Sequence, residues 1–293
     1  MFMKKILFAT DLDGTLLNDG AAVAPEHAAQ LNDMVDAGCL FTIASARSPI
    51  SAQLVLDAAG LRLSAPAVCL NGSLLWDMRA GRPVKGFPIE RQAAGAVLAL
   101  LPGSPAAGKF CVLDQSGGRL VTYYRDDIEM PDWSMRYLRS LETEKTPVLP
   151  LSAYRAADCG GAIVGFSFHD HYTRLDDLHA ALLQLDGVKT VYYADTYREG
   201  YKFLECGATD AGKGAGVKAA RDLAGADRLY VFGDNFNDLD MYRVADMSFA
   251  PVSGEPEMQK IASRVIPSNN DGGVIQTIRA YFCGGADGAA ETE

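Results

Sequence analysis

The N-terminal segment constrains the fold of this chain more than any other part of the sequence. An apolar run at residues 6–9 leads through Thr10 to Asp11-Leu12-Asp13-Gly14-Thr15. Because the run has no polar alternation, it predicts a strand that is covered on both faces, as in a parallel sheet. Open α/β sheets bind ligands outside the carboxyl ends of their strands, so the carboxylates of Asp11 and Asp13 indicate a site. The alternative is an ordinary turn, since Asp and Gly are common turn residues.

The following residues repeat the alternation of strand and helix. Apolar residues at helical spacing follow Pro25 and stop at Gly38, and a second apolar run, residues 39–44, ends at Ser45. A further helix is predicted up to Gly60, and a third apolar run, residues 67–70, ends at Asn71. This order predicts an α/β fold with a Rossmann-like parallel sheet.

A change of pattern near residue 83 indicates a second domain. Beyond it, predicted strands such as 119–125 and 188–194 alternate polar and apolar residues, and segments 131–141 and 172–185 have helical spacing. Half-exposed strands combined with helices predict an α+β domain with one open sheet face. We therefore predict a core formed by residues 1–82 and 197–283, an inserted α+β cap at 83–196, and a disordered tail at 284–293.

The core pattern resumes after the insertion and brings further polar residues. Residues 201–206 lead to Thr209 and Asp210, either of which can cap a helix that ends at Gly225. The apolar run at 229–232 ends at Gly233-Asp234-Asn235-Phe236-Asn237-Asp238. The carboxyl ends of parallel strands lie at one edge of the sheet, which should bring together Asp11, Ser45, Lys213 and Asp234.

The composition excludes several classes of function. The 293 residues carry a formal net charge of −10 at pH 7, and such an acidic surface disfavours nucleic acid as a partner. No apolar run reaches the ~18 residues of a membrane helix and no secretory leader is evident, so we expect no membrane partner and a cytoplasmic location. The six cysteines form no CxxC pair, which predicts reduced thiols without disulfides or a zinc site. The oligomeric state is not predicted.

The residue types at the expected sheet edge fit phosphoryl transfer. Several carboxylates in one place repel each other and require a hard cation, and oxygen ligands favour Mg²⁺. One aspartate can attack phosphorus and form an aspartyl-phosphate, while a second carboxylate protonates the leaving oxygen and later activates water. A hydroxyl group and a lysine can hold the phosphoryl oxygens, and Gly14 lets the backbone approach them.

These segments resemble the motifs of a known superfamily. Asp11-Leu12-Asp13-Gly14-Thr15-Leu16 resembles the first motif of the haloacid dehalogenase (HAD) superfamily, and residues 233–238 resemble its fourth. Ser45 and Lys213 fall in the order of its second and third motifs. Asn71-Gly72, the large insertion and the segment 271–274 are similar to the Cof-type sugar-phosphatase branch, which has a large α/β cap. The resemblance covers nearly the whole chain except the tail.

The resemblance implies catalytic and metal-binding roles. Asp11 would be the nucleophile and a Mg²⁺ ligand. Asp13 would be the general acid and base, and its backbone carbonyl would also bind the metal. The remaining metal ligands, or supports for the metal and its waters, would be Asp234, Asn237 and Asp238.

The resemblance also implies a phosphate site. Ser45 and Lys213 would bind the phosphoryl group, with the backbone at Gly14 and Ala46 beside it. Relatives in this branch usually read Thr-Gly-Arg where this chain has Ser45-Ala46-Arg47. Serine keeps the hydroxyl group, but the methyl group of Ala46 restricts the backbone next to the phosphate. The candidates for substrate contact are Arg47 and Asn71.

Several residues also have a simpler structural interpretation. Ser45 and Asp238 are common helix caps, Lys213 could be a solvated helix lysine, and Arg47 could form a structural ion pair. His169 and His171 face the same way on a strand, as a metal pair would, but no third ligand is evident. Four tyrosines of the cap either line a substrate surface or fill the strands: Tyr123, Tyr124, Tyr192 and Tyr193.

The predicted function is a Mg²⁺-dependent phosphatase that hydrolyses a small phosphorylated metabolite, such as a sugar phosphate, through an aspartyl-phosphate. The alternatives are a phosphomutase on this scaffold, a phospho-accepting signalling domain, and a sugar-phosphate sensor without hydrolysis. The signalling domain would have a similar acidic pocket, hydroxyl group and lysine, but it would need neither Asp13 nor the large insertion. Specificity is expected in the cap between Pro83 and Thr196, where no motif identifies the substrate.

Overall fold

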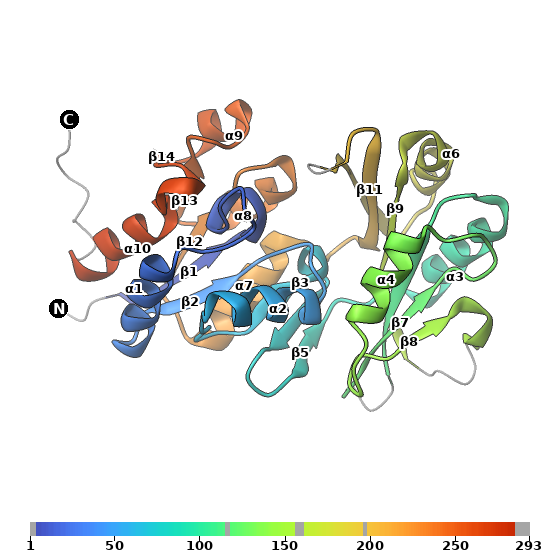
Figure 1. The fold of residues 1–293 in the computed structure, drawn as a ribbon, viewed down its shortest axis with the longest axis horizontal. Helices are drawn as coiled ribbons and strands as arrows, with labels where there is room; N and C mark the ends of the chain where they lie inside the picture. The colour runs from blue at the N-terminus through green and yellow to red at the C-terminus, as the bar shows by residue number, and fades with distance from the viewer. Residues whose placement is uncertain (1–3, 115–117, 156–160, 196–197, 285–293) are drawn as a thin grey trace. The chain divides into compact units, whose positions relative to one another are not determined.

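The computed structural model describes residues 4–114, 118–155, 161–195 and 198–284, and these form two compact units. One unit lies within Met1–Ala80 and Gly212–Glu293, and the other lies within Gly81–Ala211 (Figure 1). Segments from both halves of the chain therefore build the first unit, and the second unit is an insertion, as the sequence predicts.

The first unit is built on a five-stranded parallel sheet of order β14-β13-β12-β1-β2. Its central strand is the first apolar run, and it is buried on both faces: Leu7 and Phe8, which point to opposite faces, are 0% and 1% exposed. This agrees with the predicted parallel sheet. The strands are β1 (Ile6–Thr10), β2 (Leu40–Ile43), β12 (Arg228–Phe232), β13 (Met247–Pro251) and β14 (Arg264–Ile266).

The helices of this unit bury the residues that recur at helical spacing, such as Leu31 and Val217. Pro25 opens the first helix, where its missing N–H costs nothing, and Gly60 ends the second in the left-handed conformation. In the described residues the helices are α1 (Pro25–Asp36), α2 (Pro49–Ala59), α7 (Lys213–Ala224), α8 (Leu239–Val244), α9 (Pro256–Ile261) and α10 (Gly273–Cys283). Helix α1 packs beside α10, and α7 packs beside α8.

The third apolar run does not join the parallel sheet. It forms β3 (Ala67–Cys69), which pairs with β4 (Leu74–Asp77) in a separate sheet. The next strand along the chain is β5 (Arg82–Gly86), which belongs to the second unit. One isolated parallel bridge, Ala44 to Val68, links it to the end of β2. The prediction is wrong in this detail because the chain turns back after β3 and pairs it antiparallel with β4.

The second unit is an α+β domain built on a six-stranded sheet of order β10-β11-β9-β6-β7-β8. The strand pairs are antiparallel, except that β7 and β8 run parallel. Its strands are β6 (Gly108–Leu113), β7 (Leu120–Tyr124), β8 (Val148–Pro150), β9 (Ala162–His171), β10 (Val188–Ala194) and β11 (Tyr201–Ala208). Its helices are α3 (Arg91–Leu100), α4 (Asp132–Ser140) and α6 (Tyr172–Leu182).

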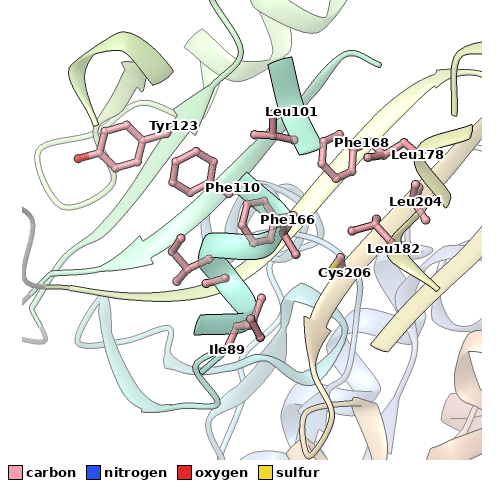
Figure 2. Close-up of a cluster of buried hydrophobic side chains, with 14 of the residues drawn as sticks. Ile89, Leu101, Phe110, Tyr123, Phe166, Phe168, Leu178, Leu182, Leu204 and Cys206 are labelled. Carbon is pink, nitrogen blue, oxygen red and sulfur yellow. The ribbon is translucent and has the colours of Figure 1, made fainter. Parts of the chain in front are cut away.

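The hydrophobic core of the second unit joins one face of this sheet to α3 and α6 (Figure 2). Rings of Phe110, Phe166 and Phe168 lie in a row, with centroids 5.4 Å and 6.5 Å apart, because alternate residues of β9 point to the same face. Tyr123 stacks on Phe110 at 5.2 Å and is 5% exposed. Tyr123 therefore fills the core, and Tyr192 packs against the same cluster.

The second unit extends further along the chain than predicted. A boundary at residue 197 assigns residues 201–206 to the core, whereas the structure pairs β11 with β9 and β10. The second unit therefore reaches Ala211. The sequence does not reveal this, because the partners of a strand are set by residues that are distant along the chain.

The described cysteines are free thiols. Cys39, Cys69, Cys111 and Cys206 are buried, and Cys283 is exposed. Cys159 and the tail from residue 285 onward lie outside the described residues. Among the helices of the described chain, none combines the length and the apolar character that a bilayer span requires.

Candidate active site

Three neighbouring strands place three polar residues side by side. Asp11 directly follows β1, Ser45 lies two residues after β2, and Asp234 lies two residues after β12. Thr10 at the end of β1 pairs with the last residue of both neighbouring strands, so the strand ends are level. Asp11 is therefore flanked by Ser45 on one side and Asp234 on the other, at the carboxyl edge of the sheet.

Lys213 reaches the same edge from the start of α7. Gly212 is the N-cap of this helix, and the predicted caps Thr209 and Asp210 instead form the turn that follows β11. The ammonium nitrogen Nζ of Lys213 lies 2.7 Å from Oδ1 of Asp11. Because the lysine side chain is only 1% exposed, the interpretation as a solvated helix lysine is excluded.

Asp11, Asp234 and Asp238 form a cluster in which one carboxylate oxygen of each residue lies within 4.8 Å of the other two. Burial raises the pKa of Asp11 to about 7; Lys213 opposes this effect, and Asp238 adds to it. Burial and the charge of Asp11 raise the pKa of Asp234 to about 7 as well, and burial raises the pKa of Asp238. One ammonium group therefore does not balance the three carboxylates, and the cluster favours a further cation.

The charge of Lys213 is stabilised by the same cluster. Burial alone would lower the pKa of its ammonium group, but the attraction of Asp11 and Asp238 outweighs burial and raises it. The lysine is therefore a permanent positive charge that is fixed next to the Asp11 carboxylate.

The loop after β1 orients Asp234. The hydroxyl group of Thr15 donates a hydrogen bond of 2.8 Å to Oδ1 of Asp234. Gly14 has a φ of +80°, and a Cβ at this position would lie 2.5 Å from Oδ2 of Asp234, so only glycine fits here. The sequence pattern assigns no role to Thr15, although its hydroxyl group directly after the glycine of the motif is an available signal.

Asp238 is both a helix cap and an ion-pair partner. Its Oδ2 accepts hydrogen bonds from the backbone N–H groups of Asp234 at 3.1 Å and Asn235 at 3.3 Å, and its Oδ1 lies 2.5 Å from Nζ of Lys213. Asn235 completes a capping box with Asp238, which sequence reasoning missed although the spacing of three residues is its signature. Asn237 lies in the same turn and is half-buried.

Asp13 is held by Arg47 and is not part of the acidic cluster. Nε of Arg47 donates to Oδ2 of Asp13 at 2.8 Å, and Nη2 donates to Oδ1 at 2.7 Å. This bidentate geometry fixes the plane of the Asp13 carboxylate. The two side chains are 25% and 37% exposed, so the pair is partly exposed to solvent. The two interpretations of Arg47 are substrate contact and a structural ion pair, and the structure shows the ion pair.

Ser45 does not cap α2, because Ser48 does so. The hydroxyl oxygen of Ser45 accepts a hydrogen bond of 3.2 Å from the backbone N–H of Arg47, and the residue is buried. Ala46 does not have the left-handed backbone that would favour glycine. The alanine in place of the usual glycine is therefore compatible with this loop.

Asn71 lies in a tight turn beside this loop. Its backbone N–H donates to the carbonyl oxygen of Ser45 at 3.1 Å, and its φ is +50°. The turn also approaches α7 closely, since a Cβ at Gly72 would lie 1.9 Å from the carbonyl oxygen of Gly212. Asn71 is thus placed between the loop of Ser45 and the start of the helix that carries Lys213.

The two histidines of the second unit have separate partners. Nε2 of His169 lies 2.7 Å from Oδ2 of Asp195, and its ring stacks on Phe203 at 3.9 Å. Nδ1 of His171 lies 2.8 Å from the hydroxyl oxygen of Thr173. In the part of the chain that the structure describes, neither histidine belongs to a group of three candidate metal ligands.

The sequence of this chain matches a known protein family over most of its length. The family of haloacid dehalogenase-like hydrolases matches residues 8–278 of this chain. The chain belongs to this family. The Cof-type branch that the sequence resembles is confirmed, and the enzyme is a phosphatase of the HAD superfamily.

Two relatives match this HAD phosphatase along nearly their full length. The chain is 25% identical over 294 residues to the 5-amino-6-(5-phospho-D-ribitylamino)uracil phosphatase YwtE of Bacillus subtilis, covering 94% of this chain and 95% of the relative. It is 23% identical over 288 residues to the pyridoxal phosphate phosphatase YbhA of Escherichia coli, covering 94% and 98%. The crystal structure of TM0651 from Thermotoga maritima shares the fold, with a TM-score of 0.70, 22% identity and coverage of 94% and 97%.

Proposed function

We propose that this HAD phosphatase hydrolyses its substrate through an aspartyl-phosphate on Asp11. An oxygen of the Asp11 carboxylate forms the new bond to phosphorus while the bond from phosphorus to the ester oxygen breaks. Asp13 gives a proton to the departing alkoxide and then takes one from the water that attacks the aspartyl-phosphate. The observation that carries this proposal is the ion pair of 2.7 Å between Lys213 and Asp11 at the edge of the sheet, flanked by Ser45 and Asp234.

Phosphoryl binding is assigned to the groups around Asp11. Lys213 and the hydroxyl group of Ser45 would hold the phosphoryl oxygens, and the backbone N–H groups at Gly14 and Ala46 would add donors. Donors that are fixed in advance stabilise the charge that develops on these oxygens in the transition state. The buried ammonium group of Lys213 also lowers the repulsion between the Asp11 carboxylate and an anionic substrate.

The acidic cluster fits a Mg²⁺ ion. Its donors are hard oxygens, and its three carboxylates exceed the single charge of Lys213. The carboxylates of Asp11 and Asp234 and the backbone carbonyl of Asp13 would hold the ion, with Asn237 as a further oxygen ligand. Both oxygens of Asp238 are engaged with Lys213 and backbone N–H groups, so Asp238 would support the site. When bound, Mg²⁺ neutralises charge between the nucleophile and the phosphoryl oxygens.

Arg47 is assigned a positioning role toward Asp13. The bidentate pair fixes the orientation of the Asp13 carboxylate, two residues after the nucleophile. An acid or base must lie within hydrogen-bond distance of the proton it transfers, so its orientation affects the rate directly.

The substrate is proposed to be a phosphate monoester of a small metabolite. The names of the relatives describe phosphatases for a ribitylaminouracil phosphate and for pyridoxal phosphate, and the sequence resemblance adds sugar phosphates. Release of inorganic phosphate from a panel of such esters, with Mg²⁺ and with a chelator, tests the proposal. Isomerised sugar phosphate without free phosphate would support a phosphomutase instead, and no turnover of any ester would contradict both.

Mg²⁺ is expected to stabilise the protein more near pH 8 than near pH 6, because protons compete for the same carboxylates. The pKa values of Asp11 and Asp234 are about 7 in the folded protein without metal, against an ordinary value of 3.8. The folded protein therefore binds these protons more tightly than the unfolded chain, and the stability they contribute is lost as pH rises from about 4 to about 7.

Thermal unfolding with Mg²⁺ and with a chelator, measured at both pH values, checks this expectation. Asp234→Asn should remove most of the Mg²⁺-dependent shift. An equal shift at both pH values in the wild type would contradict the assignment of the metal to these carboxylates.

Arg47→Lys is expected to lower kcat by roughly tenfold or more, because lysine cannot form the two parallel hydrogen bonds to Asp13. The unfolding free energy should change by less than about 1 kcal/mol, since the pair is partly exposed. Arg62→Lys is the matched control, because Arg62 forms an exposed ion pair with Asp36 at 2.7 Å. Steady-state kinetics decide: an unchanged kcat in Arg47→Lys would remove the positioning role.

A further inference from the structure

The side chain of Asn71 is a buried amide without a partner. Both its Nδ2 and its Oδ1 are buried and have no hydrogen-bond partner. Among the described residues, Asn71 is the only one with two such atoms; Asp240 and Tyr281 have one each. An unpaired buried polar group costs about 1–3 kcal/mol, and buried polar side chains are normally paired. An amide that stays unpaired therefore indicates a ligand that the protein alone does not provide.

The backbone around Asn71 is strained and firmly held. Leu70, Asn71 and Gly72 have φ values of +52°, +50° and +88°, and a leucine in this region is unusual. The N–H of Leu70 donates to the carbonyl oxygen of Arg47 at 3.0 Å, and the N–H of Asn71 donates to that of Ser45. Strain of this kind persists only where the surrounding structure enforces it, and it is concentrated at functional sites.

The position of this turn identifies the ligand class. On one side it is hydrogen-bonded to the loop of Ser45, and on the other side Gly72 lies against Gly212, next to Lys213. These neighbours are the two residues to which phosphoryl binding is assigned. A phosphoryl group has only acceptor oxygens facing such a site, so the group it requires from an amide is the N–H donor.

We propose that Nδ2 of Asn71 donates a hydrogen bond to an oxygen of the bound phosphoryl group, as a third donor beside Ser45 and Lys213. This inference rests on the proposed function, since it concerns the same site. No described group of the protein pairs with the amide, and the phosphoryl oxygen supplies the missing acceptor. The site thus retains a local instability that binding relieves.

Two variants of Asn71 test the role, with inorganic phosphate as the probe in the presence of Mg²⁺. Asn71→Gly suits the left-handed backbone and removes the amide, and it should raise the Kd for phosphate about tenfold to a hundredfold. Asn71→Asp keeps the shape and replaces the donor with an anionic acceptor, so it should weaken binding further. Binding is measured by calorimetry, and Mg²⁺ affinity should be unchanged in Asn71→Gly.

Thermal unfolding without phosphate separates this role from a structural one. A structural asparagine would lose stability when replaced, whereas Asn71→Gly should keep or raise the unfolding midpoint because it removes two unpaired buried atoms. Asn32→Ala is the matched control. Nδ2 of Asn32 donates a hydrogen bond to the carbonyl oxygen of Gly60 at 2.7 Å, and its Oδ1 accepts one from the N–H of Arg62 at 3.0 Å. This variant should lose stability and keep its phosphate affinity.

The outcomes distinguish this inference from the proposed function. A wild-type protein that neither turns over phosphate esters nor binds phosphate would contradict the function. Turnover by the wild type together with wild-type phosphate affinity in Asn71→Gly and Asn71→Asp would overturn the role of Asn71 alone.

Discussion

Replacing Asp11 with asparagine is expected to lower kcat by at least about 10⁴-fold, because the amide cannot act as the nucleophile. The substitution keeps the size of the side chain and still offers an oxygen to Nζ of Lys213, which lies 2.7 Å away in the wild type. The fold should therefore be retained. Burial and nearby carboxylates already disfavour the charge of Asp11, so its loss should not destabilise the metal-free protein.

The measurement combines kinetics with direct detection of the intermediate. Acid quenching during turnover should trap a phosphorylated protein in the wild type, and mass spectrometry should find none in Asp11→Asn. Asp36→Asn is the control, because Asp36 forms an exposed ion pair with Arg62 and belongs to none of the site motifs. Substantial kcat in Asp11→Asn would mean that another group attacks phosphorus.

Replacing Lys213 with methionine is expected to have the second largest effect, on stability as well as on activity. The variant keeps a long apolar side chain but leaves Asp11 and Asp238 buried without their common cation. Breaking a buried ion pair by removing one partner costs about 3–5 kcal/mol. Phosphate hydrolysis should fall by a hundredfold or more, about the effect of removing a preorganised charge from a transition state.

The instability of Lys213→Met should depend on pH. Without the lysine, the carboxylates avoid repulsion by taking up protons, so the loss relative to wild type should be smaller near pH 5 than near pH 8. Lys218→Met on the same helix is the matched control, since Lys218 is exposed and its replacement should change neither property. Equal stability of Lys213→Met and wild type near pH 8 would show that the buried pair contributes little. Denaturant unfolding at the two pH values provides the comparison.

The local elements were largely predictable because their signals lie within one segment. Uninterrupted apolar runs predicted β1, β2 and β12, and the residues at helical spacing predicted α1 and α7. The insertion was visible as a change from uninterrupted to alternating strands. The position of Asp11 just beyond β1 followed from the same pattern, since the run ends at Thr10.

Other features depended on which segments meet. The assignment of β11 failed because its alternating pattern is compatible with either unit, and its pairing with β9 and β10 decides. The start of α7 was predicted from the capping preference of Thr209 and Asp210, but the end of β11 and the turn after it occupy these residues. A favoured cap residue does not begin a helix where the preceding strand still requires a turn.

The chemistry of the site is also determined partly by the sequence alone and partly by the tertiary structure. The sequence by itself determined the residue types: two aspartates two positions apart after a buried strand, a serine and an acidic loop after two others, and a lysine near a helix start. Tertiary structure decided their pairing. Lys213 pairs with Asp11, which is 202 positions away in the sequence, and Arg47 pairs with Asp13, which is 34 positions away. Only the fold leaves the amide of Asn71 buried and unpaired. The physical reason is that residue type and spacing govern local conformation, whereas charge pairing and burial depend on contacts between segments that the sequence does not place next to each other.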